Sequence, residues 1–251
     1  FFSYPAVEEL DQLTAEILAT QAPSYDFELA DGVKHRLWTI QDAQQIDRII
    51  QLFAEKVPYT YVADGHHRTA AAALVGQDKK AQNPNHTGDE PYNYFMAVHF
   101  PDNQLQIIDY NRVITDLNGM SEAELLERIQ ANFEVEEKGS EAFKPSQPKQ
   151  FGMYLAGSWY ALSFKQGQAL GDNPIDQLDV SVLSSYVLEP LFDITDLRRD
   201  KRIDFVGGIR GLGELSKRVD SGEMKVAFAL YPVSMAELMN IADQGEIMPP
   251  K

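Results

Sequence analysis

The sequence contains no cysteine. Disulfide bonds and metal sites built from thiolates are therefore excluded, and this composition favours the reducing environment of the cytoplasm. The chain also lacks an apolar run close to the roughly 18 residues that a membrane helix needs. No charged segment followed by an apolar one opens it. These absences predict a soluble, cytoplasmic protein without a membrane partner.

Positive charge is scarce in this chain. It has 22 Lys and Arg residues against 38 Asp and Glu residues, which gives a formal net charge of −16. Such an acidic protein repels nucleic acid, so we expect no nucleic-acid partner. What the chain does have is length and apolar content: 251 residues, 44% of them hydrophobic, can bury a core in one large domain or two smaller ones.

Hydrophobic periodicity predicts a mixed α/β (α+β) fold with at least two layers. Helices are expected at 6–20, after Asp42, and at 66–75, 121–132, 178–192, 212–219 and 234–243. Single strands are expected at 35–40, 59–63, 203–208 and 224–230, and hairpins at 92–100 with 105–114 and at 151–157 with 158–164. Ser121 with Glu124, and Asp42 with Gln45, have the spacing of a capping box.

Two polar stretches suggest how the chain is divided. Residues 77–91 are rich in turn formers, so we expect a mobile loop with few packing contacts. Residues 138–149 resemble a linker. The expected domains are therefore 1–137, an α/β portion, and 150–251, an α+β portion.

The stretch "YVADGHHRTAAAALV" (61–75) places a strand, a polar turn and an alanine-rich helix in succession. Asp64 can serve as the N-cap, and Gly76 is a natural end for the helix. His66, His67 and Arg68 then lie in the first turn, where each cation is unfavourable by about 0.3–1 kcal/mol. An anion such as phosphate at the helix start would reverse that sign. The turn is thus a candidate phosphate site.

Three interpretations of the motif remain open. In the plainest one, Asp64 only caps the helix, Arg68 is solvated and the histidines are neutral and packed. Zinc binding by His66 and His67 is disfavoured, because adjacent helical residues diverge by about 100°. In the third interpretation the turn binds phosphate, and Asp64 holds a magnesium ion or accepts a proton from an attacking hydroxyl.

The segments "ADGHHR", "VDSGEMKVAFALYP" and "ADQGEIMPPK" resemble the DUF1015 family of uncharacterised bacterial and archaeal proteins. The "DGHHR" stretch is also similar to a motif of the archaeal free-serine kinases of the ParB/sulfiredoxin-like superfamily, in which the loop and helix start hold a nucleotide's phosphates. This resemblance implies catalytic roles for Asp64 and His67. It also implies a phosphate or nucleotide site formed by Gly65, His66, His67, Arg68 and Thr69, with magnesium on Asp64.

The same resemblance implies that the chain is a fragment. Members of the DUF1015 family carry a further N-terminal region and continue beyond the PPK segment. The opening "FFSYP" resembles the end of a buried strand, and we expect its partners to lie upstream.

Other candidates carry weaker signals. The glycine-rich turn at 206–215 could hold a second anion through Gly208 and Arg210, although a purely structural turn is the more common reason for such a pattern. The basic cluster at 196–202 favours a solvated loop, and an anion contact is the alternative. Lys251 is a weak candidate for a site lysine. We expect ordinary surface or core roles for His35, His86 and His99, and core positions for Trp38 and Trp159.

Together these features predict a small-molecule phosphotransferase, specifically a free-serine kinase that uses ATP, ADP or pyrophosphate with magnesium. A non-catalytic nucleotide-binding regulatory module is one alternative, and a phosphatase or other hydrolase using the same turn is another. The partner would be a small phosphate-bearing ligand. The oligomeric state is open, with a homodimer among the options.

Overall fold

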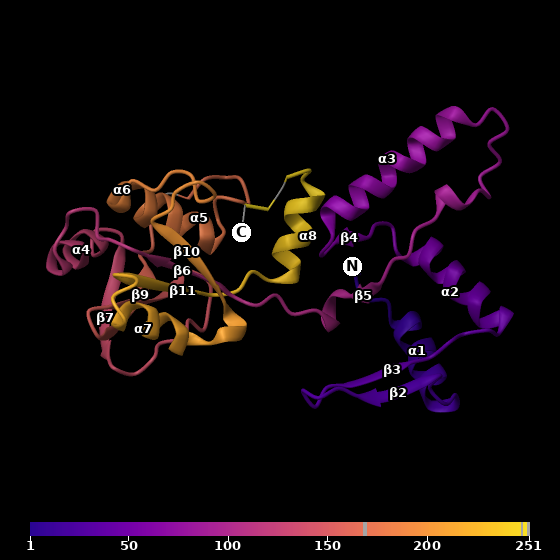
Figure 1. Ribbon diagram of the computed structural model, residues 1–251, viewed down its shortest axis with the longest axis horizontal. Helices are drawn as coiled ribbons and strands as arrows, with labels where there is room; N and C mark the ends of the chain where they lie inside the picture. The colour runs from indigo at the N-terminus through magenta and orange to yellow at the C-terminus, as the bar shows by residue number, and fades with distance from the viewer. Residues whose placement is uncertain (168–169, 247, 250–251) are drawn as a thin grey trace. The chain divides into compact units, whose positions relative to one another are not determined.

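The computed structural model of the protein describes residues 1–167, 170–246 and 248–249 (Figure 1). The chain divides into two compact units, residues 1–105 and 106–251. Helices and strands alternate in both, so the predicted mixed α/β class is confirmed. The division lies earlier than the sequence predicts, because strands that follow residue 105 pair with strands of the C-terminal half.

The first unit is built on a small sheet with order β4–β1–β5. The strand β1 (Phe2–Tyr4) runs antiparallel to β4 (Tyr61–Val62) and parallel to β5 (His99–Pro101). The helices α1 (Glu8–Thr20) and α2 (Ala43–Lys56) enclose a modest core with it, made of Tyr4, Val7, Leu10 and Leu52. The strands β2 (Tyr25–Glu28) and β3 (Lys34–Leu37) form a separate, exposed hairpin.

The helix α3 (His66–Gln82) is longer than predicted. Gly76 was expected to end it, but the helix continues for six further residues. A Cβ at position 76 would lie 3.2 Å from the carbonyl oxygen of Tyr92, so glycine here permits a close approach between α3 and the following turn. The first part of the predicted mobile loop is therefore helical.

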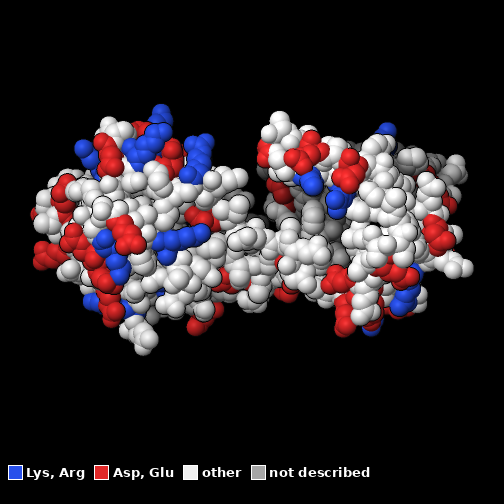
Figure 2. All heavy atoms as spheres, turned by 90° about the horizontal axis from the view of Figure 1, so that it is seen from below, with Lys and Arg blue, Asp and Glu red and all other residues white. Residues whose placement is uncertain are grey.

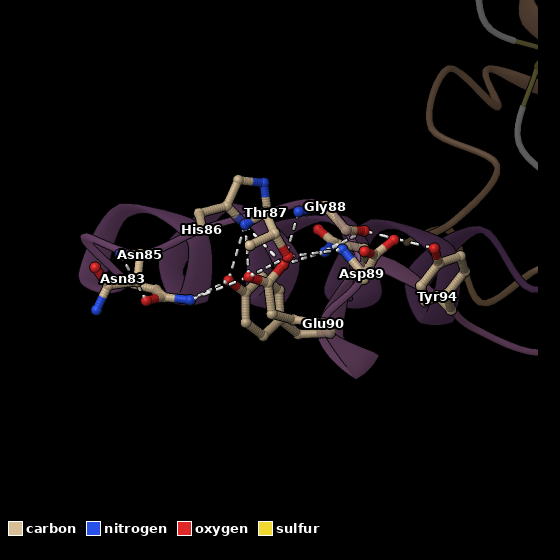
Figure 3. A network of polar contacts seen from close by, with 10 residues as sticks. Asn83, Asn85, His86, Thr87, Gly88, Asp89, Glu90 and Tyr94 are labelled. Atoms are coloured by element: carbon tan, nitrogen blue, oxygen red, sulfur yellow. Dashed lines mark hydrogen bonds and ion pairs between the residues drawn. The ribbon is translucent and has the colours of Figure 1, made fainter.

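The rest of that predicted loop is organised around Glu90 (Figure 3). Its carboxylate accepts hydrogen bonds from the backbone N–H groups of Thr87, at 2.7 Å, and Gly88, at 3.0 Å. It also contacts the Nδ1 atom of His86 and the Nδ2 atom of Asn93, both at 3.0 Å. The segment thus has an internal polar core in place of an apolar one.

These donors hold the pKa of Glu90 at about 2, chiefly through the backbone hydrogen bond from Thr87. Because the folded pKa lies below the ordinary value, the carboxylate stabilises the turn above pH 4.5. That contribution is lost as the pH falls from 4.5 towards 2. Protonation of either oxygen would weaken the hydrogen bonds that the Thr87 and Gly88 N–H groups donate to this carboxylate.

We expect Glu90→Gln to loosen the 86–94 turn at neutral pH, because one accepting oxygen becomes an NH₂ group. The measurement is NMR of the Tyr92 and Tyr94 signals over pH 2–7. In the wild type these signals should shift below pH 4.5, whereas in Glu90→Gln they should be displaced at every pH. Glu28→Gln, at an exposed position of β2, is the control. Unchanged tyrosine signals in Glu90→Gln would contradict this role.

The second unit is a six-stranded antiparallel sheet with order β10–β6–β11–β8–β9–β7. Its strands are β6 (Tyr110–Ile114), β7 (Phe133–Gly139), β8 (Gln150–Leu155), β9 (Ser158–Phe164), β10 (Ile203–Gly207) and β11 (Val226–Leu230). The predicted hairpin at 151–164 is present, and β8 pairs with β9 across a tight turn at Ala156 and Gly157, both with positive φ. The predicted linker at 138–149 belongs to this unit: its first two residues end β7, and the others connect β7 to β8.

Helices cover both faces of this sheet (Figure 1). The helices α4 (Glu122–Ile129), α5 (Asp179–Leu183) and α6 (Glu189–Phe192), with a π-helical turn between the last two, pack on one face. The helix α7 (Leu212–Asp220) packs on the other. The last helix is α8 (Met235–Asp243). The predicted capping box of Ser121 and Glu124 is present at the start of α4.

The predicted hairpin of 92–100 with 105–114 is wrong. The strand β5 pairs with β1 in the first unit, whereas β6 pairs with β10 and β11 in the second. The cause is the competition between local and distant partners: both segments alternate like strands, but their apolar faces belong to different cores. Of the two tryptophans, Trp159 is fully buried, and Trp38 is only half-buried, with its indole N–H donating to the Gln21 carbonyl.

Charged residues of both signs are interspersed over the face drawn in Figure 2. None of the helices among the described residues is both long and apolar enough to span a bilayer.

Candidate functional site

The turn that carries the DGHHR motif is held by Phe1, the residue that precedes β1. The backbone N–H groups of Ala63 and Asp64 donate to the carbonyl oxygen of Phe1, at 3.0 and 3.3 Å. The backbone nitrogen of Phe1 donates in return to the carbonyl oxygen of Asp64, at 2.9 Å. Three hydrogen bonds thus fix the main chain where β4 passes into α3.

The N-cap of α3 is Gly65, not Asp64 as predicted. Gly65 has a φ of +86°, a left-handed conformation that glycine adopts without steric cost. No side chain caps the helix. The Asp64 carboxylate turns instead to Arg68, with 3.2 Å between Oδ2 and a guanidinium nitrogen. The first N–H groups of α3 are therefore left without a capping side chain.

Arg68 folds back over the glycine to reach this carboxylate. A Cβ at Gly65 would lie 3.1 Å from a guanidinium nitrogen of Arg68, so the two groups are nearly in contact. Both charged side chains remain open to solvent, with 78% of Arg68 and 68% of Asp64 exposed. Exposed pairs of this kind contribute about 0.2–1 kcal/mol, and an incoming anion can displace the carboxylate at little cost.

The structure brings Asp64, Gly65 and Arg68 together, but it does not bring the histidines to them. His66 and His67 are both exposed, and neither imidazole ring has a hydrogen-bond partner among the described residues. Thr69 is half-buried, and its backbone N–H donates to the Gly65 carbonyl at 2.9 Å. The catalytic role of His67 and the phosphate-binding roles of His66, His67 and Thr69 remain predictions.

The start of α3 differs electrostatically from the other helix starts in the described part of the chain. An acidic residue lies in the first turn of α1, α4, α5, α6, α7 and α8, and Asp42 caps α2 through the N–H of Gln45. The first turn of α3 has neither. Its positive macrodipole end therefore has no acidic residue in the first turn and no capping side chain, and this arrangement favours a bound anion.

Farther along α3 lies a cavity of about 270 Å³ that sequence reasoning missed. It is lined by Ala72, Ala73, Gly76, Gln77 and Lys80 on the helix and by residues 92–95. The aromatic content of "YNYF" was the available signal, but the segment was interpreted as one strand of a hairpin.

The weaker candidates from the sequence are the glycine-rich turn at Gly208, the basic cluster at 196–202 and Lys251. At Gly208 the backbone N–H donates to the Asp109 carbonyl, at 2.8 Å, and the Asp109 carboxylate packs against the glycine. This fixed negative charge argues against the predicted second anion site at Gly208 and Arg210. In the basic cluster, Arg199 and Arg202 pair with neighbouring aspartates. Lys251 lies outside the described residues.

Within the residues that the structure describes, no group of three or more histidine and carboxylate side chains is placed to hold a metal ion. A magnesium ion on Asp64 would therefore depend on oxygens from the ligand itself.

A family model described as "Protein of unknown function (DUF1015)" matches residues 1–181. No curated protein matches the chain significantly. Among solved structures, a free serine kinase in complex with AMP is 18% identical, with a TM-score of 0.35 over 84% of this chain and 79% of that one. A mutant free serine kinase in complex with AMP is 15% identical, with a TM-score of 0.39 over 84% of this chain and 79% of that one. A conserved hypothetical protein from Pyrococcus furiosus is 18% identical, with a TM-score of 0.37 over 84% of this chain and 82% of that one. These TM-scores are too low to place a ligand in this chain.

Proposed function

The chain belongs to the DUF1015 family, which is described as a family of unknown function. From the residues of this chain, we propose that it is a small-molecule phosphotransferase. The DGHHR turn is the phosphate-binding element of this proposal. The donor is a nucleotide or pyrophosphate, and the acceptor is a small hydroxyl compound such as free serine.

The observation that carries the proposal is the uncapped start of α3. Its backbone N–H groups, the glycine at the N-cap and the exposed Arg68 guanidinium lie within one turn of chain. A phosphate placed there receives backbone donors, the helix dipole and a bidentate cation at once. The missing Cβ of Gly65 allows the phosphoryl oxygens to approach the main chain.

Phosphoryl transfer needs a group that accepts the hydroxyl proton and groups that neutralise the charge on the transferred phosphate. The acceptor hydroxyl oxygen forms a bond to the terminal phosphorus while the bond from that phosphorus to the leaving oxygen breaks. The Asp64 carboxylate accepts the hydroxyl proton, and Arg68 with the backbone donors neutralises the charge on the transferred group. For Asp64 to act as a base, Arg68 must move from the carboxylate to the phosphate.

Asp64 could supply one protein ligand to a magnesium ion. The ion is commonly held by one or two carboxylates together with phosphate oxygens of the substrate, and Asp64 offers one exposed carboxylate. Bound there, it would neutralise charge on the donor phosphates.

We expect Asp64→Asn to reduce transfer of phosphate to serine by about a hundred-fold or more, because the amide cannot accept the proton. The assay measures phosphoserine formation by the full chain with ATP, ADP or pyrophosphate as donor. Asp78→Asn, which changes an exposed aspartate within α3, is the matched control and should retain full activity. No turnover by the wild type with any of the three donors, or full turnover by Asp64→Asn, would overturn the proposal.

One observation favours a second candidate, a nucleotide-binding module without chemistry. In this structure the proposed base is already paired with Arg68, at 3.2 Å, so the turn is arranged for binding more than for proton abstraction. Calorimetry separates the two functions: nucleotide binding that persists in Asp64→Asn, with no turnover by the wild type, identifies the module.

A further inference from the structure

The cavity beside α3 has a floor of unusually small residues. Ala72, Ala73 and Gly76 lie on one face of the helix, and Gly76 lets the main chain at Tyr92 approach to within van der Waals contact. Larger side chains at these positions would fill the space. The floor is therefore flat and close to the helix backbone.

The opposite wall of the cavity is formed by residues 92–95 and is aromatic. The turn at 86–94 around Glu90, called the Glu90 turn below, fixes the position of this wall. The Tyr92 hydroxyl lies 2.9 Å from Nδ1 of His86 and accepts from Asn83 at 3.1 Å. Tyr94 is directed along the same turn, with its hydroxyl towards the Gly88 carbonyl (Figure 3). Tyr94 is 67% exposed, so its ring is open to solvent, whereas Phe95 is 53% exposed and its ring is tilted against that of Phe2, with 6.0 Å between the centroids.

Polar groups without partners line the remaining edge. The side chains of Gln77 and Lys80 have no hydrogen bond or ion pair with any described residue. Asn93 uses its Nδ2 atom on the Gly88 carbonyl and on Glu90, which leaves its Oδ1 atom as an unused acceptor. The cavity thus offers both donors and acceptors beside a stacking surface.

We propose that this cavity binds a planar purine-type base of the adenine kind. A free amide is the side chain that pairs with adenine through both a donor and an acceptor, and Gln77 supplies one. Exposed aromatic rings stack on a base of any kind, and Tyr94 supplies one. The volume of 270 Å³ lies just below the range for drug-sized ligands, which suits one fused ring rather than a whole cofactor.

The cavity lies in line with the DGHHR turn along the helix. His66, Thr69, Ala73, Gly76 and Lys80 follow one another at intervals of three or four residues, so they share one stripe of α3. The start of the cavity is six or seven residues from His66, about 10 Å along the axis. A nucleotide laid along this stripe places its base in the cavity and its phosphates at the helix start. This second step rests on the proposed function; binding of the base does not.

The test measures two probes, adenosine and inorganic pyrophosphate, against the full chain by calorimetry. We expect adenosine binding to weaken by about five-fold or more in Tyr94→Ala, which removes a stacking surface. Ala73→Leu, which introduces a residue with high helix propensity, should weaken adenosine binding further by filling the cavity. Both positions are exposed, so folding should be retained, and circular dichroism checks it. Tyr59→Ala, at a 70% exposed tyrosine away from the cavity, is the matched control.

The two probes separate this inference from the proposed function. Arg68→Ala should weaken pyrophosphate binding about ten-fold and leave adenosine binding unchanged, whereas Tyr94→Ala should do the reverse. No adenosine binding by the wild type at millimolar concentration would overturn the inference. Wild-type affinity in both Tyr94→Ala and Ala73→Leu would overturn it as well. If adenosine binding follows the expected pattern while phosphoserine never forms, the cavity proposal stands and the phosphotransferase fails.

Discussion

Replacing Trp159 by alanine is expected to lower the free energy of unfolding of the second unit by about 3–5 kcal/mol. Only 1% of this residue is exposed. It lies opposite Tyr154 in the register of β8 and β9, with 5.1 Å between the ring centroids. The substitution would leave a large cavity beneath α7, in the part of the core that includes Val113 and Leu215.

Trp38→Ala is the control for this experiment, and it also simplifies the measurement. Trp38 is half-buried in the first unit, so its removal should cost the second unit nothing. The chain has two tryptophans, and each variant therefore leaves one fluorescent reporter. Urea unfolding followed by circular dichroism gives the free energy of unfolding of the second unit in both variants. The fluorescence of Trp159 reports on that unit in Trp38→Ala, and the fluorescence of Trp38 reports on the first unit in Trp159→Ala. Equal losses in the two variants would contradict the dominant role of Trp159.

Gly152→Ala is expected to destabilise the same unit by about 1–3 kcal/mol or more, although it adds a single methyl group. A Cβ at this position would lie 2.6 Å from the carbonyl oxygen of Phe143 and 3.3 Å from the Trp159 ring. The carbonyl belongs to the backbone and the ring is buried, so neither can move aside cheaply. The measurement is the urea midpoint of the variant against the wild type.

Gly207→Ala is the matched control. This glycine also lies in a strand of the same sheet, but a Cβ there meets nothing within 4 Å, and its φ of −62° is open to any residue. Its substitution should be neutral or slightly stabilising, because alanine restricts the unfolded chain. Comparable destabilisation by the two substitutions would show that strand propensity, and not the close contact, determines the cost.

The parts of this fold that depend on neighbours in sequence were predictable. The capping box of Ser121 and Glu124, and the cap of α2 by Asp42, are each completed within four residues. The hairpin of β8 and β9 needs only the two residues of its turn. In these elements the local preference and the tertiary structure agree.

Elements that depend on distant partners were not predictable. Residues 92–100 and 105–114 both alternate like strands, and nothing within them shows that their partners lie in different units. Gly76 looks like a helix end, and its real role becomes visible only with Tyr92 packed against α3. The Glu90 turn has no apolar pattern at all, because hydrogen bonds order it.

For the site, the sequence located the motif but not its geometry. The position of the turn between β4 and α3 follows from propensity, and so does the concentration of cations at the helix start. The identity of the cap did not follow, because the choice between Asp64 and Gly65 depends on where Arg68 folds. The cavity beside α3 depends on a turn twenty residues farther along, so no local pattern could indicate it.

The hydrogen bonds between Phe1 and Asp64 also determine when the DGHHR turn can form during folding. They join groups 63 residues apart, and the pairing of β1 with β5 spans an even longer stretch of chain. The entropy of closing such loops must be lost before either contact stabilises the chain. The α3 helix can form locally at any time, but its starting turn acquires its final main-chain geometry only when β1 is in place. We therefore expect the N-terminal end of α3 to reach its final geometry late in folding, although its sequence motif is among the most local in the chain.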